Sequence, residues 1–331
     1  MFEIAEAMNK EGALCEWASK VNYGIELNPE EREFSEAADQ WARELGKTGK
    51  DSNGELSALF TKALTVDEVT APSELISRMF DESNIDEFDD THVVQDPKNT
   101  IQVHETIDGG NVDRSFVEHK IFRPTWKTLA AETDISMQEL RRGGYHTVAN
   151  YVNYMKEAFE AKRVGVIMNA IDAAIVSGAA NYIAESTAMP TATSMDALAL
   201  YLMDMSDGSR PLAFSLNKYR QAISKLAQAN RWPTEADKGI YNMDGFLRDY
   251  AGVELLGFSG QKKTSDNALL VPDKRVFGIA AKIGSAITRG EARTMQQEDI
   301  NQERIHVKVA GFTFGYVITN IENVAKIVMA S

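Results

Sequence analysis

HTVANYVNYMKEAFEAKRVGVIMNAIDAAIVSG, residues 146–178, is the stretch that decides the fold prediction. A helix of this length would span about 50 Å, well beyond the three or four turns usual in globular proteins. Gly143-Gly144 precedes it and Ser177-Gly178 follows it, so both ends carry signals that break a helix. The stretch fits either an ordinary core or coiled-coil helix, or a structural spine. Apolar residues recur at the three-and-four spacing of an amphipathic helix, at Val148, Val152, Met155, Phe159, Val166, Ile167, Ala170, Ile171, Ala174 and Ile175.

The composition is that of a soluble globular protein with two domains. The chain has 331 residues, of which 44% are hydrophobic and 25% charged, so it can bury a sizeable core. The single cysteine, Cys15, excludes an internal disulfide framework and cysteine-rich zinc sites, which favours a reducing compartment. No apolar run reaches 18 residues and the start lacks a signal-peptide pattern, so we expect neither secretion nor membrane insertion.

The net charge of −14 lies entirely in the first third of the chain. Residues 1–99 hold nine basic and 23 acidic side chains, whereas residues 100–331 hold 26 of each. An acidic segment repels phosphate, so this region is a poor candidate for binding nucleic acid. It is either a solvated acidic face or a surface that docks a basic partner.

A long β-hairpin is predicted between residues 100 and 122. Thr100–Ile107 alternates, Asp108-Gly109-Gly110-Asn111 supplies a turn, and Val112–Phe122 alternates again. Polar residues on both faces mean that neither face is a fully apolar core face. Because a lone hairpin is only marginally stable in water, it should lie against its own domain or against another chain. Its polar residues include His104, Glu105, Arg114, Glu118, His119 and Lys120.

The remaining elements run from helices through a mixed region to strands, which gives an α+β fold class. Short helices are expected at Phe2–Lys20, Pro29–Leu45 and Glu55–Leu64, and another follows Asp134-Ile135-Ser136. A compact α/β region should hold helices near Met195–Met205, Asn217–Arg231 and Met243–Tyr250, with strands at Pro211–Leu216 and Val253–Phe258. Closing strands are expected at Arg275–Ile283, Ala292–Met295, Ile305–Thr319 and Val324–Val328, with bulges or close contacts at Gly311 and Gly315.

The sequence contains no complete motif for catalysis, cofactor binding or metal binding. Gly46-Lys47-Thr48 lacks the upstream glycine of a phosphate-binding loop, and Gly257-Phe258-Ser259-Gly260 lacks the last glycine of a nucleophile elbow. Asp81–Asp90 lacks the central glycine of an EF-hand and is interpreted as a solvated acidic turn. The five histidines have no ligand spacing. We therefore predict no enzyme activity, no cofactor and no metal, although an α+β enzyme without a recognisable motif stays an alternative.

The order of these elements resembles a known family. An acidic helical arm, a long hairpin, a Pro-Trp strand at Pro124 and Trp126, a glycine pair, a very long helix, a compact α/β insertion and closing strands follow one another. This order is similar to that of the major capsid proteins of tailed bacteriophages, the Hong Kong ninety-seven fold. The likeness covers residues 93–331 and rests on architecture, since the family has no short invariant motif.

The resemblance implies a division into four parts. Residues 1–92 would form the acidic helical N-terminal arm and 93–127 the extended β-hairpin loop. Residues 128–190 and 274–331 would form the peripheral domain with its spine helix, 146–178, and residues 191–273 the axial domain. The charged face of the spine helix would be free to meet solvent or a neighbour's hairpin. The assembly interface would then include His104, Glu105, Asp108, Gly109, Gly110, Asn111, Arg114, Glu118, Lys120, Lys156, Glu160 and Arg163.

The resemblance also implies the function and the partners. We expect a structural protein, made in the host cytoplasm, that self-assembles into pentamers and hexamers of an icosahedral virion capsid around double-stranded DNA, without sequence recognition and without a membrane. Scaffolding, portal and decoration proteins are possible partners, and an encapsulin shell is the alternative within the fold. A Lys-to-Asn crosslink from Lys98 or Lys120 to Asn320 or Asn323 is not favoured, because these residue types are common. Nor is removal of an N-terminal segment by a protease expected.

Overall fold

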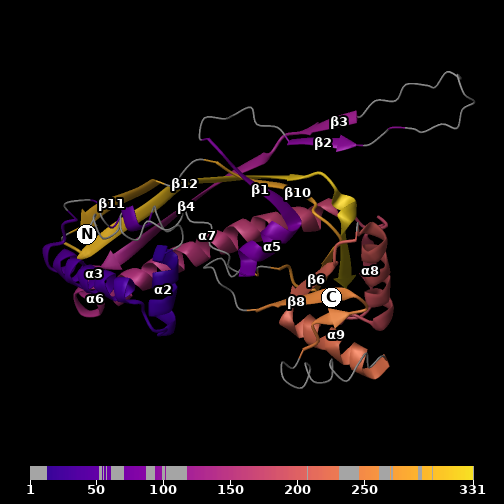
Figure 1. The fold of residues 1–331 in the computed structure, drawn as a ribbon, viewed down its shortest axis with the longest axis horizontal. Coiled ribbons are helices and arrows are strands. Elements are labelled where there is room, and N and C mark those ends of the chain that lie inside the picture. The colour runs from indigo at the N-terminus through magenta and orange to yellow at the C-terminus, as the bar shows by residue number, and fades with distance from the viewer. Residues whose placement is uncertain are drawn as a thin grey trace, which may run out of the picture.

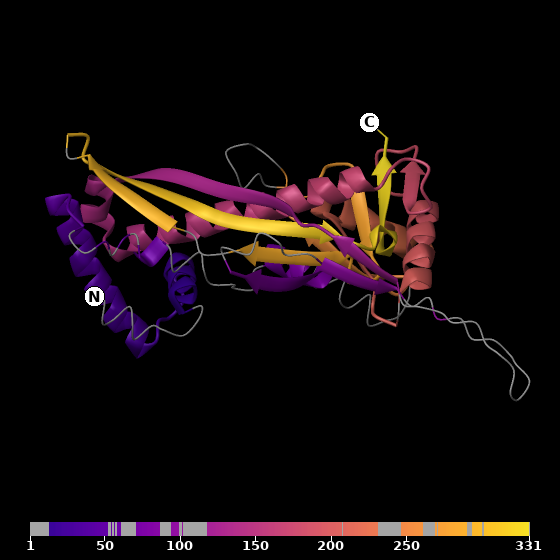
Figure 2. The same cartoon turned by 90° about the horizontal axis from the view of Figure 1, so that it is seen from above.

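The molecule is elongated, and one long helix runs along it (Figure 1). The computed structural model describes residues 13–51, 54, 56, 58–60, 71–86, 94–98, 101, 118–206, 208–230, 246–260, 269, 271–289, 293–299 and 301–330. Two helices within residues 13–48 lie at one end of the long helix and a smaller sheet with two helices lies at the other end. Seen from above, a long sheet follows the helix for most of its length (Figure 2).

The long helix is α7, Tyr145–Ala174, and its 30 residues confirm the predicted spine. It begins after Gly144, whose φ of 52° suits glycine, and a side chain there would collide with the carboxylate of Asp39. It ends four residues before the predicted Gly178, because Ile175 is already extended at φ −87° and ψ 106°.

Two hydrophobic cores meet on α7. Its first half contributes Val148, Val152, Met155 and Phe159 to a core shared with the N-terminal helices and the long sheet. Its second half contributes residues such as Val164, Ile167 and Ile171 to the core of the other end. At 100° per residue, the buried stripe turns by about a third of a circle between the two halves. The helix therefore joins two bodies that cover different sides of it.

The long sheet packs its inner face on α7. Its central strand, β12, places Ile305, Val307 and Val309 in one core and Phe314 in the other. The register between β12 and β4 shifts between Val309 and Phe312, where Gly311 has a φ of 89°, which confirms the predicted interruption. β4 (Thr125–Ser136) lies along one side of β12 (Arg304–Ile318). On the other side, β11 (Arg293–Asp299) and β10 (Gly284–Arg289) pair with successive parts of β12, and β1 (Phe80–Ile85) pairs with β10 at the edge.

The second sheet is six-stranded and carries helices α8 and α9. The phenyl rings of Phe214 and Phe277 stack at its centre with centroids 5.5 Å apart. Its order is β5 (Tyr182–Glu185), β13 (Val324–Met329), β9 (Arg275–Ile279), β6 (Leu212–Leu216), β8 (Val253–Phe258) and β7 (Asp249–Tyr250), and the helices are α8 (Ala192–Met205) and α9 (Asn217–Asn230). A 3-10 turn, η1 (Ile321–Asn323), precedes β13.

The N-terminal helices are part of the body. The predicted start of α3 at Asn28-Pro29 is confirmed, because Asn28 and Glu31 form a capping box. The Trp17 indole is fully buried and donates a 2.8 Å hydrogen bond to Ser35 Oγ. Buried apolar residues of α2 and α3 share one core with α6 and the first half of α7. The helices are α2 (Ala13–Tyr23), α3 (Pro29–Thr48), α5 (Ala71–Met79) and α6 (Met137–Gly143).

Three sequence predictions of local structure are wrong within the described residues. The predicted acidic turn at Asp81–Asp90 is β1 over its first five residues, because their backbone pairs in parallel with β10 while most of the side chains stay exposed. The strand predicted at Arg275–Ile283 ends at Ile279 as β9, and the bend after it leads into β10 of the other sheet, a strand that was not predicted. Residues 246–250, predicted as the end of a helix, lead into β7 instead.

Candidate assembly surfaces

A two-stranded ribbon projects from the body just before the start of β4. It is formed by β2 (Val94–Lys98) and β3 (Glu118–Phe122), which pair antiparallel and belong to neither of the large sheets (Figure 1). Ile121 is 65% exposed on it, and Ile101 just beyond β2 is 56% exposed. A two-stranded ribbon is marginally stable in water, and exposed isoleucines make this surface suited to cover by another chain.

The structure places only part of the predicted hairpin interface. Glu118 and Lys120 lie on β3, and the Lys120 side chain is exposed. The ribbon pairs residues 94–98 with 118–122, so its first strand begins before the predicted Thr100. The other predicted hairpin residues, His104, Glu105, Asp108, Gly109, Gly110, Asn111 and Arg114, lie outside the described residues.

The charged residues of α7 do not all lie on one free face. Lys156 is only 7% exposed, because it follows Val152 by four residues and shares the side of α7 that the N-terminal helices cover. The side chain of Arg163 is 11% exposed and its guanidinium lies 3.7 Å from the carboxylate of Glu82 on β1. Glu160 is half-buried. The expectation that these side chains are open to a neighbour is therefore wrong for Lys156 and Arg163.

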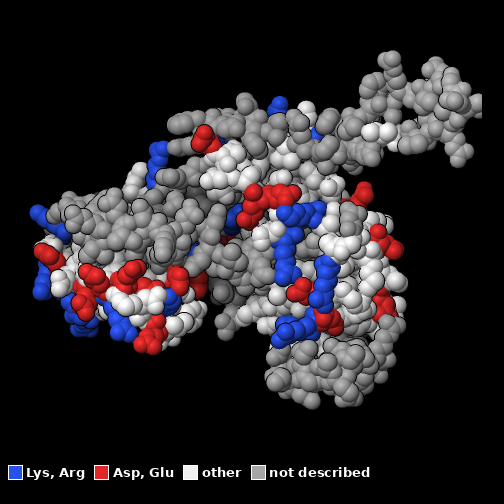
Figure 3. All heavy atoms as spheres, viewed as in Figure 1, with Lys and Arg blue, Asp and Glu red and all other residues white. Residues whose placement is uncertain are grey.

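Within the described part of the N-terminal third, several acidic side chains lie on the outer side of the helices. Glu30, Glu33 and Glu36 are exposed on α3, and Figure 3 shows acidic and basic side chains interspersed at this end of the molecule. Glu31 differs, because it is 8% exposed and accepts hydrogen bonds from Lys20 Nζ at 2.8 Å and from the Asn28 backbone N–H at 2.7 Å. Burial alone would raise the pKa of Glu31, but these two donors lower it below its usual value.

An interior ion pair fastens the end of α7 to the second sheet. Lys326 of β13 is 4% exposed, and its Nζ donates to the backbone oxygen of Asp172 at 2.6 Å and to its Oδ1 at 2.8 Å. Arg275 Nε of β9 donates to the same Oδ1 at 3.4 Å. The two cations are also stabilised by the negative C-terminal end of the α7 dipole. The carboxylate of Asp172 therefore joins three elements, α7, β9 and β13.

Among the described residues, no group of His, Cys, Asp and Glu is arranged to hold a metal ion. No helix within the described ranges is long and apolar enough to cross a membrane.

The fold aligns with solved capsid structures over about four fifths of the chain. The capsid of a native GTA particle aligns with a TM-score of 0.56 at 11% identity, over 80% of this chain and 92% of that chain. The capsid of cyanophage P-SCSP1u aligns with a TM-score of 0.53 at 12% identity, over 77% and 88% of the two chains. The chain has the Hong Kong ninety-seven fold. A structure from Gordonia phage Cozz agrees, with a TM-score of 0.52 at 10% identity over 80% and 89%.

The Hong Kong ninety-seven fold is shown by these structures alone. No family model and no curated protein matches the sequence. At identities of 10–12%, residue roles cannot be carried over from the aligned capsids, so the surfaces of this chain are argued from its own contacts. The predicted bulge or close contact at Gly315 is a close contact with Trp126 at the root of the ribbon, and sequence reasoning missed only that partner. A glycine within a predicted strand, opposite a Pro-x-Trp segment, was the available signal.

Proposed function

We propose that this chain is the structural subunit of an icosahedral phage head, which self-assembles into pentamers and hexamers around double-stranded DNA. The projecting ribbon is the observation that carries the proposal, together with the fold. Its strands pair with each other and with no other described strand, and Ile121 is left 65% exposed. In a shell, such a ribbon gains a neighbour that buries it, and each copy repeats the same contact.

The proposed division into domains is compared with the two hydrophobic cores on α7. Residues 93–127 would be the extended loop that reaches a neighbour, and residues 191–273 would form the axial domain. Residues 128–190 and 274–331 would form the peripheral domain, although β5, β9 and β13 from these segments share a sheet with β6 and β8. Residues 1–92 would act as a helical arm that stays packed on the body, since Trp17, Phe34 and Phe60 belong to the core of α7.

The proposed partners are further copies of the same chain. DNA would be enclosed without sequence recognition, because the first third of the chain is strongly acidic and the remainder has no excess of positive charge. Scaffolding, portal and decoration proteins are compatible with this role. The virion is the proposed location.

Electron microscopy of the purified protein tests the proposal. We expect closed shells or curved sheets of capsomers at high concentration. A stable monomer or dimer under all assembly conditions would refute the shell function and favour the α+β enzyme. Particles recovered from producing cells should contain DNA, and particles filled with protein instead would refute the role as a phage head and favour an encapsulin.

A substitution on the ribbon tests its role in assembly. Ile121→Asp places a charge on the exposed ribbon surface and is expected to leave the subunit folded but to reduce shell formation. Met295 of β11 is similarly exposed, at 62% against 65%, and is also on a strand, so Met295→Asp is the matched control. Equal loss of assembly in both variants, or normal assembly of Ile121→Asp, would contradict the special role of the ribbon.

A further inference from the structure

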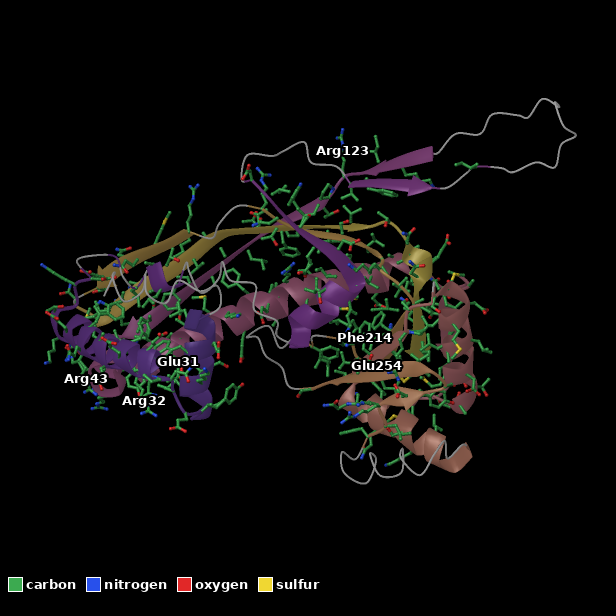
Figure 4. The ribbon with its side chains drawn as sticks, viewed as in Figure 1. Glu31, Arg32, Arg43, Arg123, Phe214 and Glu254 are labelled. Atoms are coloured by element: carbon green, nitrogen blue, oxygen red, sulfur yellow. The ribbon has the colours of Figure 1, made fainter. Side chains whose placement is uncertain are left out.

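The ribbon is joined to the body through a very short connection. β3 ends at Phe122 and β4 begins at Thr125, so only Arg123 and Pro124 lie between them. Figure 4 labels Arg123 at this point, where the ribbon leaves the long sheet. The proline ring fixes its own φ and confines Arg123 to extended conformations, which makes the connection stiff along the chain.

The connection is also packed against the outer face of the long sheet. A Cβ on Gly315 would stand 2.8 Å from Cε3 of Trp126 and 3.1 Å from Cβ of Pro124. The indole and the proline ring therefore lie directly on the bare backbone of Gly315. Real Cβ atoms essentially never approach other atoms as closely as 2.8 Å, so the position admits only glycine unless the indole moves.

Two residues of β10 extend this contact. The register places Ile287 opposite Gly315, which is itself opposite Trp126, so all three lie on one face of the sheet. Ile287 has no exposed surface, although it belongs to neither of the two cores around α7. The guanidinium of Arg289 lies over the Trp126 ring, 5.6 Å from its centroid. The outer face thus has its own small packed cluster at the root of the ribbon.

We propose that Pro124, Trp126 and Gly315 form a joint that sets the direction of the ribbon before assembly, so that each free subunit already presents it to the next copy of the chain. The inference rests on the proposed shell function and names the residues that position its contact. A ribbon on a loose connection would sample many directions, and only a fraction would suit docking. If that fraction falls to about a tenth, the apparent dissociation constant for each subunit rises about tenfold.

Two pairs of variants test the joint in the full-length protein. Gly315→Ala displaces the indole, and Gly260→Ala is its control because a Cβ at Gly260 meets nothing within 4 Å. Trp126→Ala removes the indole without a clash, and Trp126→Phe keeps a ring over Gly315. We expect the concentration needed for shell formation to rise about tenfold or more in Gly315→Ala and Trp126→Ala, and to stay near the wild-type value in the other two.

A distance measurement separates positioning from general stability. Spin labels at Lys120→Cys on the ribbon and Lys308→Cys on β12, in a Cys15→Ser background, report the direction of the ribbon in unassembled subunits. We expect one narrow distance distribution in this labelled background, a displaced or broadened one when Gly315→Ala or Trp126→Ala is added, and a narrow one with Trp126→Phe. If Gly315→Ala fails to fold, the distance distribution of Trp126→Ala tests the joint.

The outcomes distinguish the joint from the shell function. A broad distribution in the labelled background, or wild-type assembly and a narrow distribution in Trp126→Ala, would overturn the joint while leaving the shell function intact. If the unmodified protein forms no shells at any concentration, the shell function is refuted, and the distance distributions still decide whether the joint directs the ribbon.

Discussion

The ion pair between Lys326 and Asp172 provides a quantitative prediction of how α7 is fastened to the second sheet. Lys326→Met keeps the length of the side chain and removes its charge, and Asp172→Asn removes the opposite charge. Breaking a fully buried pair by removing one partner costs about 3–5 kcal/mol. The side chain of Asp172 is 26% exposed and keeps Arg275 as a neighbour, so we expect each single variant to lose about 2 kcal/mol of unfolding free energy.

A double-mutant cycle measures the interaction itself. Each single variant leaves the other charge without its closest partner, whereas the double variant removes both. The double variant should therefore be destabilised by at least about 1 kcal/mol less than the sum of the two single variants. Unfolding of unassembled subunits by urea, followed by circular dichroism, gives the free energies. Additivity within about 0.5 kcal/mol would refute the coupling, since independent sites behave in this way.

Three further predictions concern single residues. Gly165→Ala should stabilise the subunit by about 1 kcal/mol in urea unfolding, because the residue is inside α7 and a Cβ there meets nothing within 4 Å; a loss of stability would contradict this. Gly278→Ala should destabilise it by about 1–2 kcal/mol, because the new Cβ would stand 2.5 Å from Cδ1 of Leu202 in the core; unchanged stability would show that the core adapts. A hydrogen bond from Thr191 and smaller contributions lower the pKa of Glu185 to about 2, so its stabilising effect should be complete above about pH 4.5 and lost as the pH falls through 2. Comparing wild type with Glu185→Gln across that range checks the sign, and a difference that grows toward low pH would contradict it.

The sequence predicted the elements that depend on local pattern. The spine helix, the start of α3 at Asn28 and the interruption of β12 at Gly311 were all recognisable, because each follows from periodicity, capping or glycine over a few residues. The order of such elements was also enough to predict the Hong Kong ninety-seven fold, which the solved capsids bear out. The order of helices and strands along the chain is kept when individual residues are replaced.

The elements that were missed depend on distant partners. β1 is acidic and mostly exposed, and nothing in its own composition indicates a strand; it is one because β10 lies beside it, about 200 residues further along the chain. Lys156 was misjudged because α7 was treated as having a single buried face. The N-terminal helices cover a further side of its first half, so Lys156, which the apolar pattern places on the charged face, is buried there.

The joint at Gly315 shows why a surface for assembly is harder to predict than a core. A buried glycine is visible as a break in an apolar pattern, but its reason lies in Trp126 on another strand, about 190 residues earlier. The indole lies on the outer face, where sequence patterns predict solvent and where substitutions are usually tolerated. If the joint directs the ribbon, Trp126→Ala should affect assembly more strongly than it affects the unfolding of the free subunit. A core residue such as Phe214 would show the reverse order, with loss of folding accounting for any loss of shells.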